Sequence, residues 1–112
     1  MSQITSHVLD TSLGKPGSNL HIELQAMTDD TWQTIGSGLT DDDGRVSTLL
    51  ADDQILAPGN YQLLFHTGSY YEAQAIASFY PEVRIQFRVI DASHYHVPLL
   101  LNPFGYSTYR GS

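Results

Sequence analysis

Short runs in which hydrophobic and polar residues alternate recur along the chain, and clusters of turn-forming residues separate them. The clearest run covers residues 82–90, where four apolar side chains alternate with Arg84, Gln86 and Arg88. Alternation with a period of two predicts strands with one buried face. Further strands are predicted over residues 4–10, 20–24, 31–39, 61–65 and 95–101. Many short strands bounded by turns favour an all-β sandwich or barrel.

Residues 69–77 break this pattern and predict one short helix. The stretch contains good helix formers and lacks Gly and Pro. Ser69 followed by Glu72 three positions later is typical of a capping box, in which each side chain bonds the backbone N–H of the other residue. We therefore expect the helix to begin at Ser69.

Pro98 lies inside the apolar run 95–101, although proline has no N–H to donate to a sheet. Its position predicts an edge strand or a β-bulge. An apolar edge strand exposes unpaired backbone groups, which a neighbouring subunit can cover.

Size and composition narrow the class of protein. The 112 residues suit a single domain spanning residues 1–112. The formal charge of −7 disfavours nucleic acid and anionic membranes as partners, because phosphate groups are bound by Lys and Arg. No run approaches the roughly 20 apolar residues that cross a bilayer. The N-terminus does not resemble a signal peptide, so we expect a cytoplasmic protein.

Cysteine is absent, which excludes disulfides, thiol nucleophiles and cysteine-ligated zinc. The five histidines are then the side chains that titrate near neutral pH without further help. His94 and His96 are two apart on a predicted strand and therefore share a face. The pair is consistent with a metal site, a proton-transfer site or two solvated histidines.

Three further features carry candidate chemistry with an ordinary structural alternative, and a fourth is the aromatic tail. His7 on the first strand is either a catalyst or a structural residue. Arg45 leaves the turn at residues 41–44 and can bind an anionic or carbonyl-rich ligand, or pair with the adjacent aspartates. The aspartates lack EF-hand spacing, which favours a plain polar turn over a cation site. The aromatic tail at residues 104–112 is expected to dock on the rest of the chain.

Several motifs together resemble the transthyretin-related protein family. They are His7-Val8-Leu9-Asp10, Gly14-Lys15-Pro16, Leu20-His21-Ile22-Glu23-Leu24, Asp43-Gly44-Arg45, Phe79-Tyr80-Pro81-Glu82-Val83, His94-Tyr95-His96-Val97-Pro98-Leu99-Leu100 and Tyr109-Arg110-Gly111-Ser112. The closing tetrapeptide is the specific part of the match. It is similar to the signature of the 5-hydroxyisourate hydrolases, which the hormone-carrying transthyretins lack.

The resemblance implies a transthyretin-like sandwich of seven to eight strands with one short helix, assembled as a homotetramer that is a dimer of dimers. It implies hydrolysis of 5-hydroxyisourate to 2-oxo-4-hydroxy-4-carboxy-5-ureidoimidazoline, on the route from urate to allantoin, without a metal or cofactor. The implied catalytic residues are His7, Arg45, His96 and Ser112. The implied substrate contacts are His7, Arg45 and Tyr109, with His94, Arg110 and Gly111 in supporting roles.

Two other functions remain open from the residues themselves. A sandwich of this kind can carry a small ligand without catalysis, since fold does not fix function. Alternatively, His94 and His96, together with His7, can form a zinc- or copper-binding protein, because neutral imidazoles at strand spacing ligate both ions.

Overall fold

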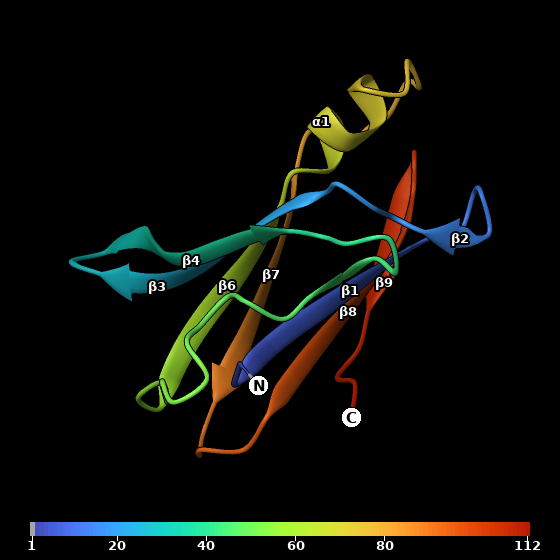
Figure 1. Cartoon of the computed structure of the whole chain (residues 1–112). Coiled ribbons are helices and arrows are strands. Elements are labelled where there is room, and N and C mark those ends of the chain that lie inside the picture. Colours follow the sequence, from blue (N-terminus) through green and yellow to red (C-terminus); the bar gives the residue numbers. More distant parts are fainter. Residues whose placement is uncertain (1) are drawn as a thin grey trace.

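Two β-sheets and one short helix make up the computed structural model, which describes residues 2–112 (Figure 1). The five-stranded sheet has the order β2-β1-β8-β9, with β5 also paired to β1, and the four-stranded sheet has the order β4-β3-β6-β7. The strands are β1 (Ile4–Asp10), β2 (Lys15–Pro16), β3 (His21–Thr28), β4 (Thr31–Leu39), β5 (Arg45–Val46), β6 (Gly59–Phe65), β7 (Val83–Val89), β8 (Tyr95–Asn102) and β9 (Gly105–Thr108). Seven of these described strands have four residues or more, as expected for the predicted sandwich. No helix within residues 2–112 is long and apolar enough to cross a membrane.

Parallel pairing of β1 with β8 forms the centre of the five-stranded sheet (Figure 1). The register places Thr5 opposite His96 and His7 opposite Pro98. Since β9 pairs with the other side of β8, the edge-strand prediction for Pro98 is wrong. The missing N–H is tolerated because β9 ends at Thr108, opposite Leu99, so the ladder is interrupted next to Pro98. The Pro98 carbonyl accepts a hydrogen bond from the Thr108 hydroxyl at 2.7 Å.

The helix α1 (Thr67–Glu72) begins two residues before the predicted start at Ser69. The N-cap residue is His66, and it makes no side-chain capping bond, so the predicted capping box is wrong. Its backbone N–H instead donates to the carbonyl of His21 at 3.0 Å, which continues the β3–β6 ladder directly into the helix. Tertiary pairing therefore sets the helix start and overrides the local capping signal.

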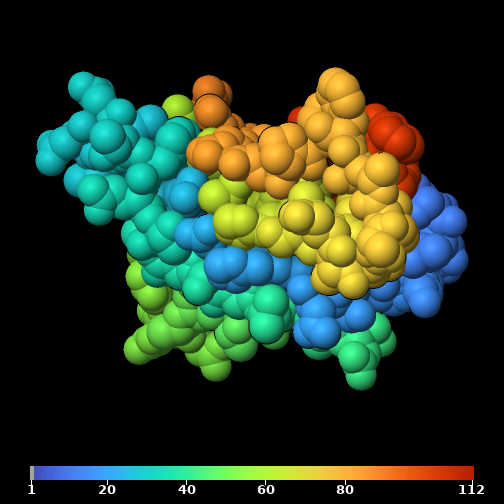
Figure 2. Space-filling model, turned by 90° about the horizontal axis from the view of Figure 1, so that it is seen from above, coloured from blue at the N-terminus to red at the C-terminus, as the bar shows by residue number. Residues whose placement is uncertain are grey.

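The same helix ends earlier than the predicted limit at Ala77. Ala75 adopts a left-handed conformation with φ of 56°. The N–H groups of Ala75 and Ile76 donate back to the carbonyls of Glu72 and Tyr71, both at 3.0 Å, which is the Schellman pattern of helix termination. Figure 2 shows this segment (yellow) on the surface beside the segment that leads into β7 (orange).

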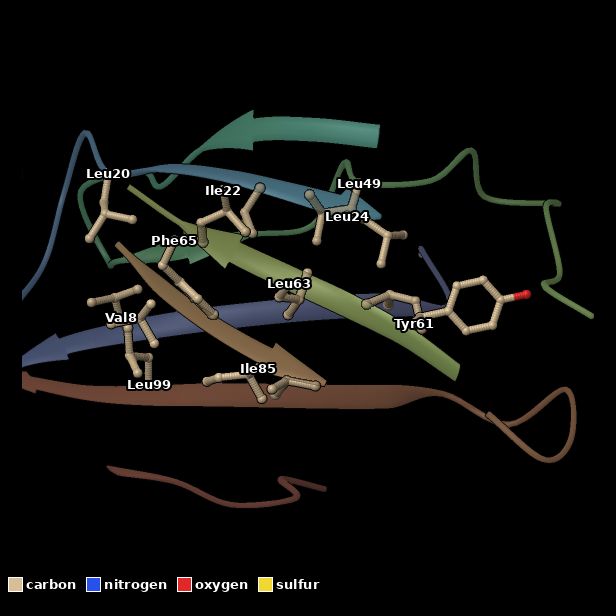
Figure 3. Close-up of a cluster of buried hydrophobic side chains, with 14 of the residues drawn as sticks. Val8, Leu20, Ile22, Leu24, Leu49, Tyr61, Leu63, Phe65, Ile85 and Leu99 are labelled. Carbon is tan, nitrogen blue, oxygen red and sulfur yellow. The ribbon is translucent and has the colours of Figure 1, made fainter. Parts of the chain in front are cut away.

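Apolar side chains from both sheets meet in one core (Figure 3). Ile22, Leu24 and Leu63 of the four-stranded sheet are fully buried with Val8 and Leu99 of the five-stranded sheet. Full burial of each such side chain contributes about 1.5–3 kcal/mol. Because side chains alternate along a strand, these inward positions turn their neighbours on β1 and β8 toward the outer face of the five-stranded sheet.

A buried carboxylate joins β1 to α1. Asp10 is fully buried, and its Oδ1 accepts hydrogen bonds from the backbone N–H of Ser12 at 3.0 Å and the Ser12 hydroxyl at 2.5 Å. Its Oδ2 accepts the hydroxyl of Tyr70 at 2.9 Å. A buried charge is tolerated only when it is hydrogen-bonded in this way. This aspartate of the first motif is therefore a structural residue.

We predict that Tyr70→Phe lowers the free energy of unfolding by about 1.5–3 kcal/mol, because it removes a hydrogen bond to a buried charge. The matched control is Tyr106→Phe, which removes a hydroxyl from a side chain that is 42% exposed. Urea unfolding of both variants measures the effect. A Tyr70→Phe protein as stable as its control contradicts the structural role of the bond.

Candidate active site

His7 and Arg45 are neighbours on the outer face of the five-stranded sheet. The antiparallel pairing of β1 with β5 places them directly opposite each other. Arg45 is held there by the preceding turn, in which Asp41 Oδ1 accepts its backbone N–H at 3.0 Å. Gly44 has φ of 74° and approaches the Val8 carbonyl so closely that a Cβ would lie 2.4 Å from its oxygen. Only glycine fits at this position, so the turn fixes where Arg45 leaves it.

The guanidinium of Arg45 is not paired with the neighbouring aspartates. Within residues 2–112, the ion pairs join His66 to Glu23 and Arg84 to Glu82. Arg45 is exposed, so its cationic side chain is available to a ligand. The turn predicted for residues 41–44 is confirmed by the backbone N–H groups of Asp43 and Arg45, which donate to Asp41 Oδ1.

Three histidines gather beside Arg45 through the pairing of β1 with β8. The rings of His7 and His96 stack with centroids 5.8 Å apart and an interplanar angle of 11°. The rings of His94 and His96 lie 6.3 Å apart at 21°, which confirms that they share a face. His7 and His96 are half-buried, whereas His94 is exposed. The face is therefore polar, rich in imidazole and open to solvent in a single chain.

Thr5 links two of these histidines and was not identified from the sequence. Its Oγ1 lies 2.8 Å from Nε2 of His94 and 2.8 Å from Nδ1 of His96. Thr5 is buried and stands directly opposite His96 in the β1–β8 register. In the sequence, Thr5 is two positions from His7 and therefore shares its face of the strand. That spacing indicates a contact with His94 and His96 only once the pairing of β1 with β8 is known.

The tail docks on β8 and places its last residues beside His96. The N–H of Gly111 donates to the His96 carbonyl at 2.9 Å. A Cβ at Gly111 would lie 2.6 Å from Cδ2 of the His96 ring, so the close approach requires glycine. Ser112 follows Gly111 and is exposed. The guanidinium of Arg110 lies 4.7 Å from the centroid of the Tyr95 ring and anchors the tail by a cation–π contact.

Tyr109 precedes Arg110 in the docked tail. Together with His96 and Arg110 it lines a cavity of about 310 Å³ between the tail and β7. Its side chain is 55% exposed. The structure therefore groups His7, Arg45, His94 and His96 and brings Gly111 next to His96. Ser112 follows Gly111 in the chain, and Tyr109 shares a cavity lining with His96.

Electrostatics favour the neutral form of His96. Burial lowers the pKa of His96, and the positive charges of His7, His94 and Arg45 lower it further. A neutral imidazole accepts a proton, whereas Arg45 keeps its charge at any ordinary pH. The site thus offers a proton acceptor next to a fixed cation, a combination suited to activating water and stabilising a developing negative charge.

Comparison with known proteins agrees with this geometry. Residues 4–111 match the sequence profile of the HIUase/Transthyretin family. The chain belongs to the HIUase/transthyretin family. A probable 5-hydroxyisourate hydrolase from Caenorhabditis elegans is 47% identical over 112 residues, which cover 99% of this chain and 82% of that relative.

Solved structures of the HIUase/transthyretin family have the same fold. The 5-hydroxyisourate hydrolase of Klebsiella pneumoniae has a TM-score of 0.85 at 31% identity, covering 97% of this chain and 98% of that one. Sea bream transthyretin in complex with thyroxine has a TM-score of 0.89 at 28% identity, covering 97% and 94%. Since a hydrolase and a protein solved in complex with thyroxine share this fold, the site residues must decide the function.

We predict that NMR titration gives His96 a pKa below the ordinary value of 6.5. Arg45→Gln should raise this pKa, because it removes a charge that disfavours the protonated ring. Arg84→Gln on the other sheet is the matched control and should leave the value unchanged. A wild-type His96 pKa above 6.5, or no response to Arg45→Gln, contradicts the proximity argument.

The same shift has a consequence for stability. The folded state binds a proton at His96 less readily than the unfolded state. Above pH 6.5 the lowered pKa of His96 therefore does not reduce the free energy of unfolding. The folded state loses stability as the pH falls from there through the lowered pKa.

Proposed function

We propose that the protein hydrolyses 5-hydroxyisourate to 2-oxo-4-hydroxy-4-carboxy-5-ureidoimidazoline, a step from urate toward allantoin. The observation that carries this proposal is the convergence of His7, Arg45 and His96 on one face. Curated 5-hydroxyisourate hydrolases that resemble the chain over nearly its full length support the choice of substrate. The expected cytoplasmic location remains a prediction from the sequence alone.

In this proposal His96 is the general base. Neutral His96 takes a proton from water, and the water oxygen bonds to the lactam carbonyl carbon. The C–N bond of the ring then breaks, and His96 returns the proton to the departing nitrogen. General acid–base help of this kind is worth about 10²–10⁴-fold in rate. His7, stacked on His96, orients the water and the substrate.

Thr5 sets the tautomer that this role requires. A base at Nε2 of His96 must carry its proton on Nδ1, and that N–H donates to Thr5 Oγ1. The single hydroxyl proton of Thr5 then donates to Nε2 of His94. This chain of hydrogen bonds makes Thr5 and His94 positioning residues, because they act through His96.

Arg45 binds the oxygen-rich ring and stabilises the negative charge that develops on the attacked carbonyl oxygen. A donor in this role contributes roughly 3–4 kcal/mol of transition-state stabilisation. In the same proposal the Ser112 hydroxyl positions water beside His96, and Tyr109 lines the substrate from the tail. Gly111 lets the tail approach His96, and Arg110 anchors it on Tyr95.

A ligand carrier on the same sandwich is the alternative, and sea bream transthyretin with thyroxine is its precedent. A carrier needs shape and apolar contacts, whereas a lowered histidine pKa beside a fixed cation is a property of proton-transfer sites. The arrangement around His96 therefore favours catalysis over simple carriage.

We also propose that four copies of the chain assemble as a dimer of dimers. β7 and β9 end their sheets with unpaired backbone groups, and Phe79, Ile90 and Phe104 near them are 65–69% exposed. Edge pairing of two chains would cover these groups. Two such dimers meeting at their five-stranded sheets would exclude water around His7 and Arg45.

The direct test follows the ultraviolet decay of 5-hydroxyisourate freshly generated from urate. We expect the protein to accelerate the decay and Arg45→Ala to lower kcat/KM by about 10²–10³-fold, the usual loss for one oxyanion donor. Arg84→Ala, on the opposite sheet, should retain wild-type activity. Decay at the spontaneous rate with the wild-type protein refutes the proposed function.

Thr5→Val should lower kcat by about ten-fold or more while KM changes little, because the substrate does not contact Thr5. Thr5→Ser keeps the hydroxyl and should restore most of the activity. The pH profile supplies the second readout, since loss of the tautomer control moves the acid limb that reports His96. Equal activity of the valine and serine variants shows that the hydroxyl has no role.

Light scattering should give a mass near four times the 12.4 kDa of one chain. Leu9→Arg introduces a charge beside His7 on the outer face and should reduce the assembly to two chains. Leu39→Arg, at a position on β4 that is 59% exposed, is the control and should stay at four. A fully active monomer argues against a shared site.

A further inference from the structure

A second cluster of metal-ligating side chains lies on the other sheet, away from His7 and His96. His21 and Glu23 are two apart on β3 and share a face, and His66 follows β6 opposite His21. One ligand atom from each of the three residues lies within 4.8 Å of the other two. The proposed hydrolysis assigns no role to these three residues.

The backbone and one neighbouring side chain hold this cluster in place. The rings of His21 and His66 stack with centroids 4.7 Å apart and an interplanar angle of 9°. The N–H of His66 donates to the His21 carbonyl at 3.0 Å, which pins the two residues together. Glu23 Oε2 lies 2.5 Å from Nε2 of His66, and Glu23 Oε1 accepts the Thr34 hydroxyl at 2.6 Å.

Two hydrogen-bonding partners fix the orientation of the Glu23 carboxylate. The Thr34 hydroxyl contacts Oε1, and the His66 ring contacts Oε2. Thr34 leaves Oε2 directed at the histidines because it occupies Oε1. A hydrogen bond to the second oxygen of a carboxylate ligand is the kind of outer contact that orients ligands in metal sites.

Two imidazoles and one carboxylate suit a divalent transition ion. Zinc takes nitrogen ligands at about 2.0–2.1 Å and carboxylate oxygen at about 2.0–2.2 Å, so ligand atoms in a tetrahedral site lie roughly 3.3 Å apart. The present spacing of up to 4.8 Å needs only small side-chain rotations to reach that value. Three protein ligands leave a fourth coordination position open.

Two of the three ligands border a surface hollow. His21 and His66 line a cavity of about 350 Å³ together with Lys15 and Tyr70. Figure 2 shows the α1 segment (yellow) next to the blue segment that enters β3, and the two segments form the walls of this hollow. Since His21 is exposed, an ion can reach the cluster from solvent.

We propose that His21, Glu23 and His66 bind one divalent transition-metal ion of the zinc class. The ion replaces the proton shared between His66 and Glu23 and ties β3 to the start of α1. Water or a small anion from the hollow completes its coordination. The proposal is independent of the proposed hydrolysis, whose steps use His7, Arg45 and His96 on the other sheet.

The test is a titration of the full-length protein with zinc chloride, followed by imidazole nitrogen NMR and calorimetry. We expect the His21 and His66 resonances to shift together at one equivalent of bound zinc. His21→Ala removes an exposed side chain, and Glu23→Gln keeps the shape of the carboxylate while removing its charge. Each should weaken this binding at least ten-fold without changing hydrolysis in the absence of zinc.

His94→Ala is the matched control, because it removes a histidine from the other cluster. It should leave the His21 and His66 shifts unchanged. Zinc at 100 µM should also raise the Tm of the wild-type protein more than that of His21→Ala, which shows that the folded site is occupied. Shifts confined to His7, His94 and His96, or binding that survives both His21→Ala and Glu23→Gln, overturn the proposal.

Discussion

Parallel pairing of β1 with β8 is the constraint on which the site depends. The register runs from Ile4 opposite Tyr95 to Asp10 opposite Leu101. Burial of Val8 and Leu99 locks it, because a slip by one residue would turn apolar side chains outward and polar ones into the core. The same register turns the candidate catalytic residues of both strands to one outer face. The pairing of β1 with β8 therefore places the core on one face of the sheet and the candidate catalytic residues on the other.

The two sheets use histidine differently. On the five-stranded sheet, burial and then the neighbouring imidazoles and Arg45 lower the pKa of His96, which favours a neutral proton acceptor. On the four-stranded sheet, Glu23 accepts a hydrogen bond from His66. The hydrogen bonds from Thr34 and His66 lower the pKa of Glu23, which keeps its carboxylate negatively charged beside His21. Neighbouring positive charges keep a histidine neutral and able to accept a proton, which suits acid–base catalysis. A carboxylate among imidazoles supplies negative charge and ligand atoms, which suits binding of a cation. The chemistry follows from the charge of the residue that each histidine meets.

The sequence predicted the strands well, because their alternation reflects burial directly: Val83 and Val89 of β7 are buried and Arg84 is exposed. Prediction from the sequence failed where pairing between segments distant in the chain determines the local structure. The start of α1 follows from the β3–β6 ladder, and Pro98 is central because the ladder is interrupted beside it. Motifs supplied the candidate site residues, but their roles remain proposals. Thr5 was missed because its contacts exist only after β1 and β8 pair.

The most direct test of the account is a crystal structure with a stable cyclic-ureide analogue of 5-hydroxyisourate bound. The account predicts that the analogue lies on the outer face of the five-stranded sheet, with an oxygen against the Arg45 guanidinium and its ring beside His7 and His96. Binding in the hollow beside His21 and His66, with the face around Arg45 left to solvent, would contradict it.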